Sequence, residues 1–426
     1  FFCRNIYEFR MFISRIENSQ KYRFLLVLGC ASLMVFLSMG MRQGMGLFLE
    51  PITSALGVDR ETFSLAIAWQ NLILALPLFG VIADLIGFRR VALLGGVVYG
   101  GGLWLASQSS SAWGLYANLG GVVGVGIGLS GMIVVMGAVG QVAPPERRST
   151  AFGIVTVAFS IGMFTMIPLL QFWIEKHGWS GALEAAGGVV LAISLLALGL
   201  PDKSSSAEKT SGSVPELELS LGRTLNGART HSGYLLLNLG FFVCGFHVAF
   251  IGTHLPAFLQ GEGVSASAAS WALAMIGLFN IFGSLVFGRL GDSLSKKSLL
   301  SVLYTLRVVV ITVFLAIPLS DFTAIVFGAA IGFLWLATVP LTSGIVAQIF
   351  GTRYLTTLWA IVFFSHQLGA FLGVWLGGRV YDSTGSYTTV WLAAIVLGLF
   401  AGIVHLPIRE QPWQPSLPDP QPAVGE

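Results

Sequence analysis

The chain has 426 residues, of which 55% are hydrophobic and only 10% are charged, and its mean hydropathy is +0.81. Soluble domains carry roughly 25% charged residues, so this composition excludes an ordinary soluble domain and indicates an integral membrane protein embedded in a lipid bilayer. The net charge of +3 gives no support to a nucleic-acid partner, and three scattered cysteines predict neither a disulfide framework nor a metal site.

Twelve apolar segments follow a charged N-terminal stretch. Residues 1–22 lack a cleavage-site pattern, so we expect a cytoplasmic segment there and no signal peptide. The apolar segments each approach the length of about 20 residues that crosses a bilayer core of about 30 Å. They are residues 24–48, 62–83, 91–110, 114–140, 151–173, 181–200, 234–259, 268–290, 299–318, 322–350, 355–379 and 388–407. We therefore expect an all-α membrane protein with 12 transmembrane helices in two six-helix bundles, at 23–200 and 232–407.

The distribution of positive charge indicates the orientation. If both termini are cytoplasmic, eighteen of the 23 Lys and Arg residues fall in cytoplasmic segments, and only Arg60, Lys176 and Arg379 fall outside. Because Lys and Arg favour cytoplasmic loops, we expect a multi-pass protein of the cytoplasmic membrane with both termini inside. The remaining two cations, Arg42 and Arg307, lie within apolar segments.

Arg42 lies in the first segment among Gly40, Gly44 and Gly46, which allow a ligand or a helix to approach. All 20 Asp and Glu residues fall in termini, loops or segment ends, so no mid-membrane carboxylate can neutralise this charge. A lone buried ion is costly, and a carboxylate from solution fits the guanidinium fork. We expect Arg42 to bind an organic anion. The alternative is a structural arginine that bonds helix-end carbonyls or extends toward the membrane surface.

Two loops repeat one pattern 208 residues apart. Residues 80–90 read Gly-Val-Ile-Ala-Asp-Leu-Ile-Gly-Phe-Arg-Arg, and residues 288–297 read Gly-Arg-Leu-Gly-Asp-Ser-Leu-Ser-Lys-Lys. Internal symmetry of this kind is typical of transporters built from two similar bundles, so we expect pseudo-symmetric halves. The candidate gating residues are Gly80, Asp84, Gly87, Arg89, Arg90, Gly288, Asp292, Lys296 and Lys297.

Polar segments separate and end the two expected bundles. Residues 201–231 are rich in Ser, Lys and Glu and predict a cytoplasmic linker. Residues 408–426 contain five prolines in their last part, which predicts a disordered cytoplasmic tail.

Three histidines in the second half could carry a coupling proton. His247 and His254 lie in the seventh segment and His366 in the eleventh. Histidine exchanges protons near neutral pH, and the apolar segments hold no mid-depth carboxylate to do so instead. The alternative for each is a neutral ring bonded to a backbone or hydroxyl group. His247 and His254 are seven residues apart, which is too far for a joint metal site, where a spacing of four is expected.

Other polar side chains complete the candidate substrate site. Arg307, about ten residues beyond Lys297, is a buried charge that either meets a ligand or bonds neighbouring carbonyls. Amides and hydroxyls in the segments either bind a polar ligand or join helices. The candidate substrate-binding residues are Arg42, Gln43, Asn118, His247, His254, Asn280, Thr338, His366 and Gln367; Gln70, Asn71 and Thr342 are further polar residues of the same kind.

The twelve segments, the six-plus-six repeat and the paired Gly-x-x-x-Asp loops resemble the major facilitator superfamily. The first loop matches the family motif at Gly80, Asp84 and Gly87 and at both arginines, and it departs where Leu85 and Phe88 stand at positions that are often basic. The resemblance implies that the loops form charge contacts that hold one gating state closed. The alternative is that the arginines only determine topology.

Two stretches are similar to the bacterial monocarboxylate and oxalate–formate transporter branch. Residues 41–49, Met-Arg-Gln-Gly-Met-Gly-Leu-Phe-Leu, look like the first-helix segment of that branch, which carries a cation there. Residues 381–387, after the eleventh segment, are also similar. Members often carry an arginine in the eighth segment, whereas this chain has Asn280 and Ser284 and no charge before Arg289. The anion site is therefore not a copy of theirs.

The sequence thus predicts a monomeric secondary transporter, not an enzyme, that moves a small organic anion by alternating access and needs no cofactor. Proton symport and anion exchange both stay open. The alternative is a drug or toxin efflux transporter of the same superfamily, although the fifth segment lacks the Gly-Pro-Gly-Gly pattern of proton–drug antiporters. A transporter-like sensor is a third possibility, against which the intact loop motifs argue.

Overall fold

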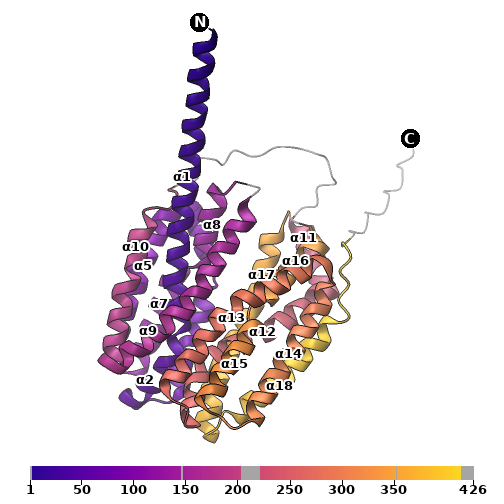
Figure 1. Cartoon of the computed structure of the whole chain (residues 1–426). Helices are drawn as coiled ribbons and strands as arrows, with labels where there is room; N and C mark the ends of the chain where they lie inside the picture. Colours follow the sequence, from indigo (N-terminus) through magenta and orange to yellow (C-terminus); the bar gives the residue numbers. More distant parts are fainter. Residues whose placement is uncertain (1, 145–146, 203–220, 352, 414–426) are drawn as a thin grey trace, which may run out of the picture.

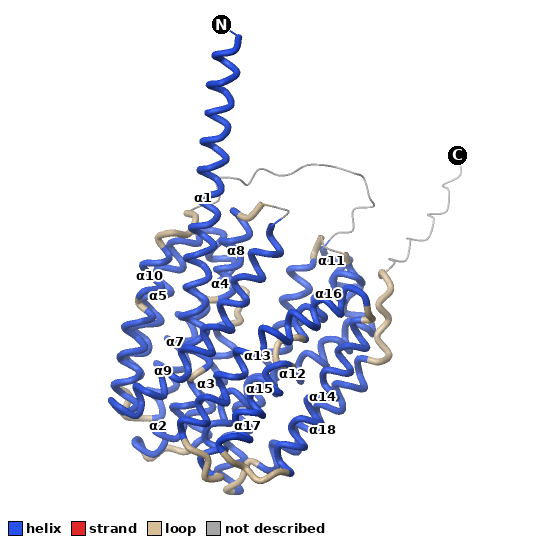
Figure 2. The backbone as a smooth tube through the Cα atoms, viewed as in Figure 1, coloured by secondary structure: helices blue, strands red, loops and turns tan. Residues whose placement is uncertain are grey.

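The computed structural model describes residues 2–144, 147–202, 221–351 and 353–413. Within these ranges every regular element is a helix and no strand occurs, which confirms the all-α class. Figures 1 and 2 show two groups of helices side by side, one from each half of the chain. The start of α1 and the helix α11 lie toward the same end of the molecule, which we call the terminal end; the other is the distal end.

The first half contains ten α-helices, one 3₁₀-helix (η1) and one π-helix (η2) among the described residues. Pro77 separates α3 from α4, because proline has no N–H to donate to the preceding turn. The elements are α1 (Phe2–Gln43), η1 (Met45–Phe48), α2 (Leu49–Leu56), α3 (Arg60–Leu74), α4 (Leu78–Ile86), α5 (Phe88–Ser107), α6 (Ala112–Gly114), η2 (Leu115–Val122), α7 (Val123–Ser130), α8 (Met132–Val142), α9 (Arg148–Val190) and α10 (Ala192–Ala197).

The second half contains eight described helices. Ser265, Ser295 and Ser320 begin three of them, and each side chain accepts a hydrogen bond from a backbone N–H of the first turn, which is the usual N-cap arrangement. The elements are α11 (Leu221–Thr230), α12 (Ser232–Gly261), α13 (Ala266–Ser293), α14 (Lys296–Ala316), α15 (Asp321–Phe333), α16 (Thr338–Phe350), α17 (Leu355–Thr384) and α18 (Thr388–His405).

Ten helical stretches of the described chain are long and apolar enough to cross a membrane, or eleven if the bent pair α3 and α4 counts as one span. At about 1.5 Å per residue, an unbroken α9 would be about 64 Å long, roughly twice the bilayer core. Gly178 interrupts it with φ 70°, a backbone conformation that glycine adopts readily. The fifth and sixth predicted spans therefore meet at Gly178, and the described helices agree with the predicted architecture.

Breaks occur in the second and the tenth predicted spans, and the fourth is interrupted at Gly131, between α7 and α8. The second bends by 46° between α3 and α4. The tenth is interrupted at residues 334–337, between α15 and α16. Pro340 lies in the first turn of α16, where proline is tolerated. It has no N–H to bond the carbonyl four residues earlier, so the helix does not extend toward α15. These breaks leave helix-end backbone groups that need partners from elsewhere in the fold.

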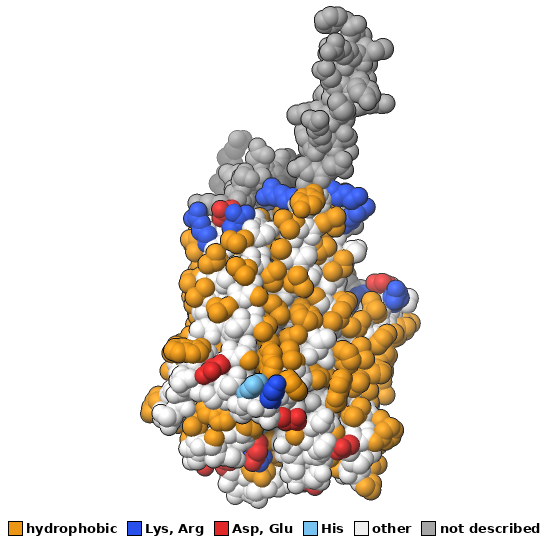
Figure 3. Space-filling view, turned by 60° about the vertical axis from the view of Figure 1, so that its left-hand side comes forward, with side chains coloured by type: hydrophobic (Ala, Val, Ile, Leu, Met, Phe, Trp, Pro, Cys, Tyr) orange, Lys and Arg blue, Asp and Glu red, His pale blue; other side chains and the backbone are white. Residues whose placement is uncertain are grey.

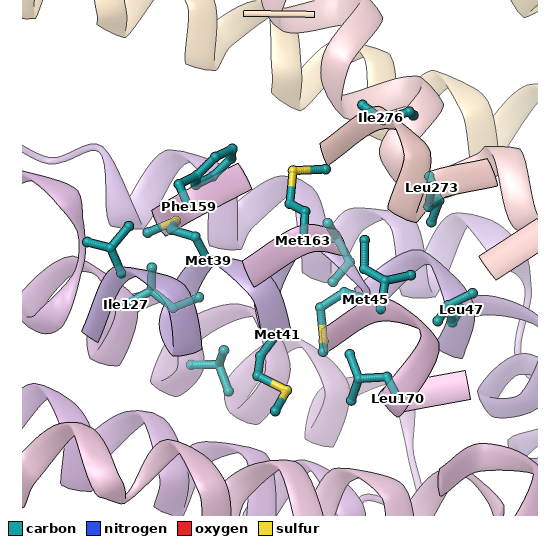
Figure 4. Packing of buried hydrophobic residues seen from close by; sticks show 14 of the residues in the cluster. Met39, Met41, Met45, Leu47, Ile127, Phe159, Met163, Leu170, Leu273 and Ile276 are labelled. Atoms are coloured by element: carbon teal, nitrogen blue, oxygen red, sulfur yellow. The ribbon is translucent and has the colours of Figure 1, made fainter. Parts of the chain in front are cut away.

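The two halves touch mainly along two helix pairs, and also where α12 meets η1 and α2. Within the first half α1 packs on α9, and within the second half α12 packs on α17. Between the halves, α17 packs along α3, and α13 packs along α9. Figure 4 shows one apolar part of this contact region, where side chains of α1, α9 and α13 meet. Met39, Met41, Met45 and Met163 contribute flexible side chains there, which fill irregular gaps well.

The expected linker and tail differ in detail from the structure. Residues 221–230, expected in the linker, form α11, whereas residues 203–220 lie outside the described ranges. The beginning of the expected tail packs on the second half, because the Trp413 N–H donates to the Ile349 carbonyl (2.7 Å) and its ring lies against Gly227. Residues 414–426 lie outside the described ranges.

The surface agrees with a protein that crosses a membrane several times. Figure 3 shows Lys and Arg side chains gathered mainly at the terminal end, above a broad band of hydrophobic side chains. Many large apolar side chains of the described chain are exposed, including Leu195, Ile403 and Val396. Such an apolar surface suits lipid and not water.

Candidate functional site

Arg42 lies in the last turn of α1, where a positive charge complements the helix dipole. Its side chain is partly exposed. Nη1 donates to Gln43 Oε1 (2.9 Å), Nη2 donates to Asn71 Oδ1, and Nε is buried without a hydrogen-bond partner in the described structure. Both partners are neutral amides. No described carboxylate forms an ion pair with Arg42.

Asn71 connects this arginine to the other half of the molecule. It lies in the last turn of α3, where the Ala75 N–H turns to the Leu72 carbonyl (3.3 Å) and leaves the Asn71 carbonyl free. Gln367 of α17 donates to that carbonyl through Nε2 (2.8 Å), and its Oε1 lies 2.8 Å from Nδ1 of His366. A hydrogen-bonded path thus runs from Arg42 through Asn71 and Gln367 to His366, and it crosses from one half to the other.

Asn280 forms a second polar contact between the halves. Its Nδ2 donates to Ser160 Oγ of α9 (2.9 Å), and its Oδ1 accepts from the Leu336 N–H (2.9 Å) at the break between α15 and α16. The amide therefore joins α13 to α9 and to the break between α15 and α16, and it occupies its hydrogen-bonding groups in doing so. Gln43 reaches the same helix α9 through Met163, whose sulfur lies 3.8 Å from Gln43 Nε2.

His247 and His254 are buried within the second half and do not join the Arg42 path. His247 Nε2 lies 2.8 Å from the Ala394 carbonyl of α18. His254 Nε2 lies 2.8 Å from the Val374 carbonyl of α17, and its Nδ1 lies 3.2 Å from the Tyr387 hydroxyl. These are the backbone and hydroxyl contacts of the alternative interpretation, and they hold α12 to its neighbours.

Arg307 and Thr338 lie at the break between α15 and α16. Arg307 is 1% exposed and donates to the Leu334 carbonyl through Nε (3.1 Å) and Nη2 (2.7 Å), and also to the Trp335 carbonyl. These are carbonyls that a helix end leaves without partners. Cys244 Sγ accepts from Arg307 Nη1 (3.5 Å) and lies 3.3 Å from Thr338 Oγ1. The contacts of Arg307 follow the second of its two interpretations, bonding to neighbouring carbonyls.

Asn118 lies apart from the other candidate residues. Its amide donates to the Leu105 carbonyl (3.2 Å) and to Ser109 Oγ (3.1 Å), and so ties η2 to the end of α5 within the first half. The fold thus brings Arg42, Gln43, His366 and Gln367 into one connected group. Asn71, which the sequence offered only as one polar residue among several, completes that group.

The paired loops contact the ends of their own halves. Gly87, with φ 99°, turns the chain sharply from α4 into α5 and places two arginines in the first turn. Arg89 Nε donates to the Leu200 carbonyl (3.0 Å), and Asp202 lies 3.8 Å from Arg89 and 3.7 Å from Arg90. In the second half, Lys297 Nζ donates to the Leu406 carbonyl (3.0 Å) and its N–H to Glu410 (2.7 Å).

The loop contacts are therefore symmetric: each loop is tied to the segment that follows the last helix of its half. Asp84 and Asp292 are exposed, and Gly80 and Gly288 are partly exposed. Lys296 lies along Gly344 of α16, again in its own half. No hydrogen bond or ion pair of these loops crosses between the halves in the part of the chain that the structure describes.

The distal end carries a polar cluster that sequence reasoning missed. Asp382 of α17 accepts from the N–H groups of Arg60 (3.2 Å) and Glu61 (2.6 Å) at the start of α3. Glu61 in turn accepts from Trp375 Nε1 (2.9 Å) and pairs with Arg379 (3.1 Å). We call these five residues the distal cluster. Its signal in the sequence was the pair of charged stretches at 59–61 and 379–382, which lie in opposite halves.

Comparison with known proteins identifies the family. The sequence profile described as Major Facilitator Superfamily matches residues 31–265 and 237–423. The chain belongs to the major facilitator superfamily. This confirms the resemblance drawn from the paired loops, and membership in a family of transporters confirms that the protein is not an enzyme.

Relatives with similar sequences lie in the monocarboxylate branch of this superfamily. Monocarboxylate transporter 12 of Mus musculus is 27% identical over 380 residues, which span 81% of this chain and 77% of the relative. The uncharacterized MFS-type transporter YcxA of Bacillus subtilis (strain 168) is 26% identical over 385 residues, which span 87% of this chain and 91% of the relative. The predicted similarity to that branch is confirmed.

Solved structures share the fold at low sequence identity. The nucleoside transporter NupG matches with a TM-score of 0.71 and 12% identity, over 90% of this chain and 99% of that one. A bacterial homolog of the human lysosomal transporter Spinster, in an inward-facing and unoccupied conformation, matches with a TM-score of 0.70 and 16% identity, over 90% of this chain and 93% of that one. These matches concern the fold alone.

Proposed function

We propose that this protein is a secondary transporter that moves a small carboxylate across the cytoplasmic membrane, and that Arg42 binds the carboxylate group. The observation that carries the proposal is Arg42, a partly exposed residue near the contact between the halves, whose guanidinium hydrogen-bonds to neutral amides. A partly buried cation without a protein anion favours an anionic ligand. The relatives named monocarboxylate transporters support the same class of cargo.

We infer alternating access from the contacts between the halves. Among the described residues, the polar contacts that cross between them lie at Asn71 and Gln367, at Ser160 and Asn280, and at the distal end, in the distal cluster and between Arg60 and the Tyr387 hydroxyl. Within the described ranges, the paired loops at the terminal end form hydrogen bonds with their own halves and none across. This pattern supports a state closed at the distal end. Because positive residues gather at the terminal end, that end is proposed to face the cytoplasm.

A ligand screen on the purified protein tests the cargo class. We expect small carboxylates such as pyruvate, L-lactate or succinate to raise the melting temperature, because a ligand that binds the folded state stabilises it by mass action. Amino acids and the lipophilic cation tetraphenylphosphonium form the comparison set. Stabilisation by the lipophilic cation with no response to any carboxylate would contradict the proposal and favour efflux.

We propose that His366 carries the proton if transport is coupled to one, since its ring joins the Arg42 path through Gln367. The thiol of Cys244 faces it from α12, and Phe241 and Phe363 pack on the ring. Replacement of His366 with glutamine is expected to remove the response of uptake to a pH gradient in proteoliposomes. His247→Gln and His254→Gln are the matched comparisons and should keep it. An unchanged pH response in His366→Gln would rule out this carrier.

A further inference from the structure

The two terminal nitrogens of the Arg42 guanidinium are bound in the way that a carboxylate would bind them. Gln43 Oε1 accepts from Nη1 and Asn71 Oδ1 accepts from Nη2, so two separate amide oxygens occupy the two positions of the fork. A bidentate carboxylate presents one oxygen to each of two parallel N–H groups. Any carboxylate that binds Arg42 through these nitrogens must therefore displace the two amides.

The two amides are not held equally. Gln43 follows Arg42 directly in the chain, is partly exposed, and has only a long contact from its Nε2 to the Met163 sulfur (3.8 Å). Asn71 is 2% exposed and its backbone carbonyl is fixed by Gln367, which is 3% exposed. Asn71 is thus the firmly positioned competitor for the guanidinium.

Resting on the proposed function, we propose that Asn71 is a selectivity-determining residue, and that Gln367 positions it from the other half. A neutral ligand offers Arg42 only what the Asn71 amide already provides. The bonds from the charged guanidinium to the amides are already charge-assisted, but a carboxylate adds the attraction between two opposite charges, which an amide oxygen lacks. An anion therefore displaces the Asn71 amide from Arg42, whereas a neutral analogue of the same shape does not.

Gln367 affects this selectivity for anions only through Asn71. The α3 helix ends three residues after Asn71 and the chain then bends, so that the carbonyl of Asn71 has no helical partner of its own. The amide of Gln367 supplies that partner across the contact between the halves. Without it, the last turn of α3 loses the hydrogen bond that fixes where the Asn71 side chain points.

Equilibrium binding of L-lactate and its neutral amide, L-lactamide, tests this assignment. Asn71→Asp places a carboxylate beside Arg42 with almost no change in shape, and we expect it to weaken L-lactate binding by at least about tenfold. Asn71→Ala removes the competitor, and we expect the preference for L-lactate over L-lactamide to fall by about fivefold or more. Asn238→Asp is the matched control, since the Asn238 amide donates to the Tyr234 carbonyl within α12.

A double-mutant cycle tests the role of Gln367. Gln367→Ala is expected to lower the lactate-to-lactamide preference in the wild-type background and to leave it unchanged in the Asn71→Ala background, because the two residues act in series. A purely structural role would change stability without changing this ratio.

The outcomes separate this inference from the proposed function. If the wild-type protein binds L-lactate and Arg42→Ala does not, but Asn71→Asp binds L-lactate as the wild type does, the assignment of Asn71 is overturned and the function stands. If Asn71→Ala keeps the wild-type preference for L-lactate over L-lactamide, the role of Asn71 in selectivity is likewise overturned. If Arg42→Ala binds L-lactate as tightly as the wild type does, both the function and the inference fail.

Discussion

Replacement of Arg42 with alanine is expected to abolish uptake of the cognate carboxylate while the protein remains folded in the membrane. Truncating one partner of a desolvated charge pair costs about 2–5 kcal/mol, or roughly thirtyfold to several thousandfold in affinity. Among the described residues Arg42 hydrogen-bonds to Gln43 and Asn71 and forms no ion pair, so its removal breaks none. Uptake of labelled pyruvate or L-lactate into proteoliposomes, at matched protein content, measures the effect.

Two further variants test whether the loss of uptake is specific to the charge and shape of Arg42. Arg42→Lys should retain partial uptake, because lysine keeps the charge and loses the bidentate fork. Arg229→Ala removes an exposed arginine of α11 that donates to Asn226, and it should transport as the wild type does. Equal uptake by Arg42→Ala and the wild type would remove Arg42 from the site.

Replacement of Asp382 with alanine is expected to open the distal end. Asp382 caps the N-terminus of α3 from the opposite half, where its carboxylate accepts from two backbone N–H groups. Loss of such a cap costs about 1 kcal/mol, which corresponds to roughly a fivefold shift between two states. Because this cap forms only while the halves touch, its loss weakens the closed state selectively. Spin labels at Ser54 and Thr389, which are exposed in opposite halves, should report an added longer distance.

The chain supplies a matched control for this measurement. Asp321 likewise accepts two hydrogen bonds at the start of a helix, from the N–H (2.9 Å) and Oγ (2.8 Å) of Ser265, but both residues belong to the second half. Asp321→Ala should therefore leave the distance distribution as in the wild type. A distribution in Asp382→Ala identical to that of the wild type would show that this contact does not hold the distal end closed.

The fold was largely predictable from the sequence, because the bilayer demands long apolar segments and internally bonded backbones. The repeat of the two loops also predicted the symmetric halves. In the structure Arg89 and Lys297 bond to corresponding segments, each just after the last helix of its own half. The breaks in the second and tenth spans were not predicted. Pro77 gave a signal for the first, whereas the second depends on Asn280 and Arg307, which contact the backbone only once the helices have packed.

The site was only partly predictable, for a related reason. The positions of the charged residues singled out Arg42, because the sequence itself shows that no Asp or Glu lies at mid-membrane depth to pair with it. The partners of buried amides and histidines are not visible there, since each is decided by tertiary contacts. Thus His254 bonds to the Val374 carbonyl 120 residues away, and Gln367 bonds to the Asn71 carbonyl 296 residues away. Spacing along the chain gives no indication of either contact.

The sharpest test is a structure of the protein with a bound carboxylate, such as L-lactate. If Arg42 binds the carboxylate group, we expect its two oxygens within hydrogen-bonding distance of Nη1 and Nη2 of Arg42, with the side chains of Gln43 and Asn71 turned away from those nitrogens. A carboxylate bound elsewhere, with both amides still on the guanidinium, would contradict this assignment of Arg42.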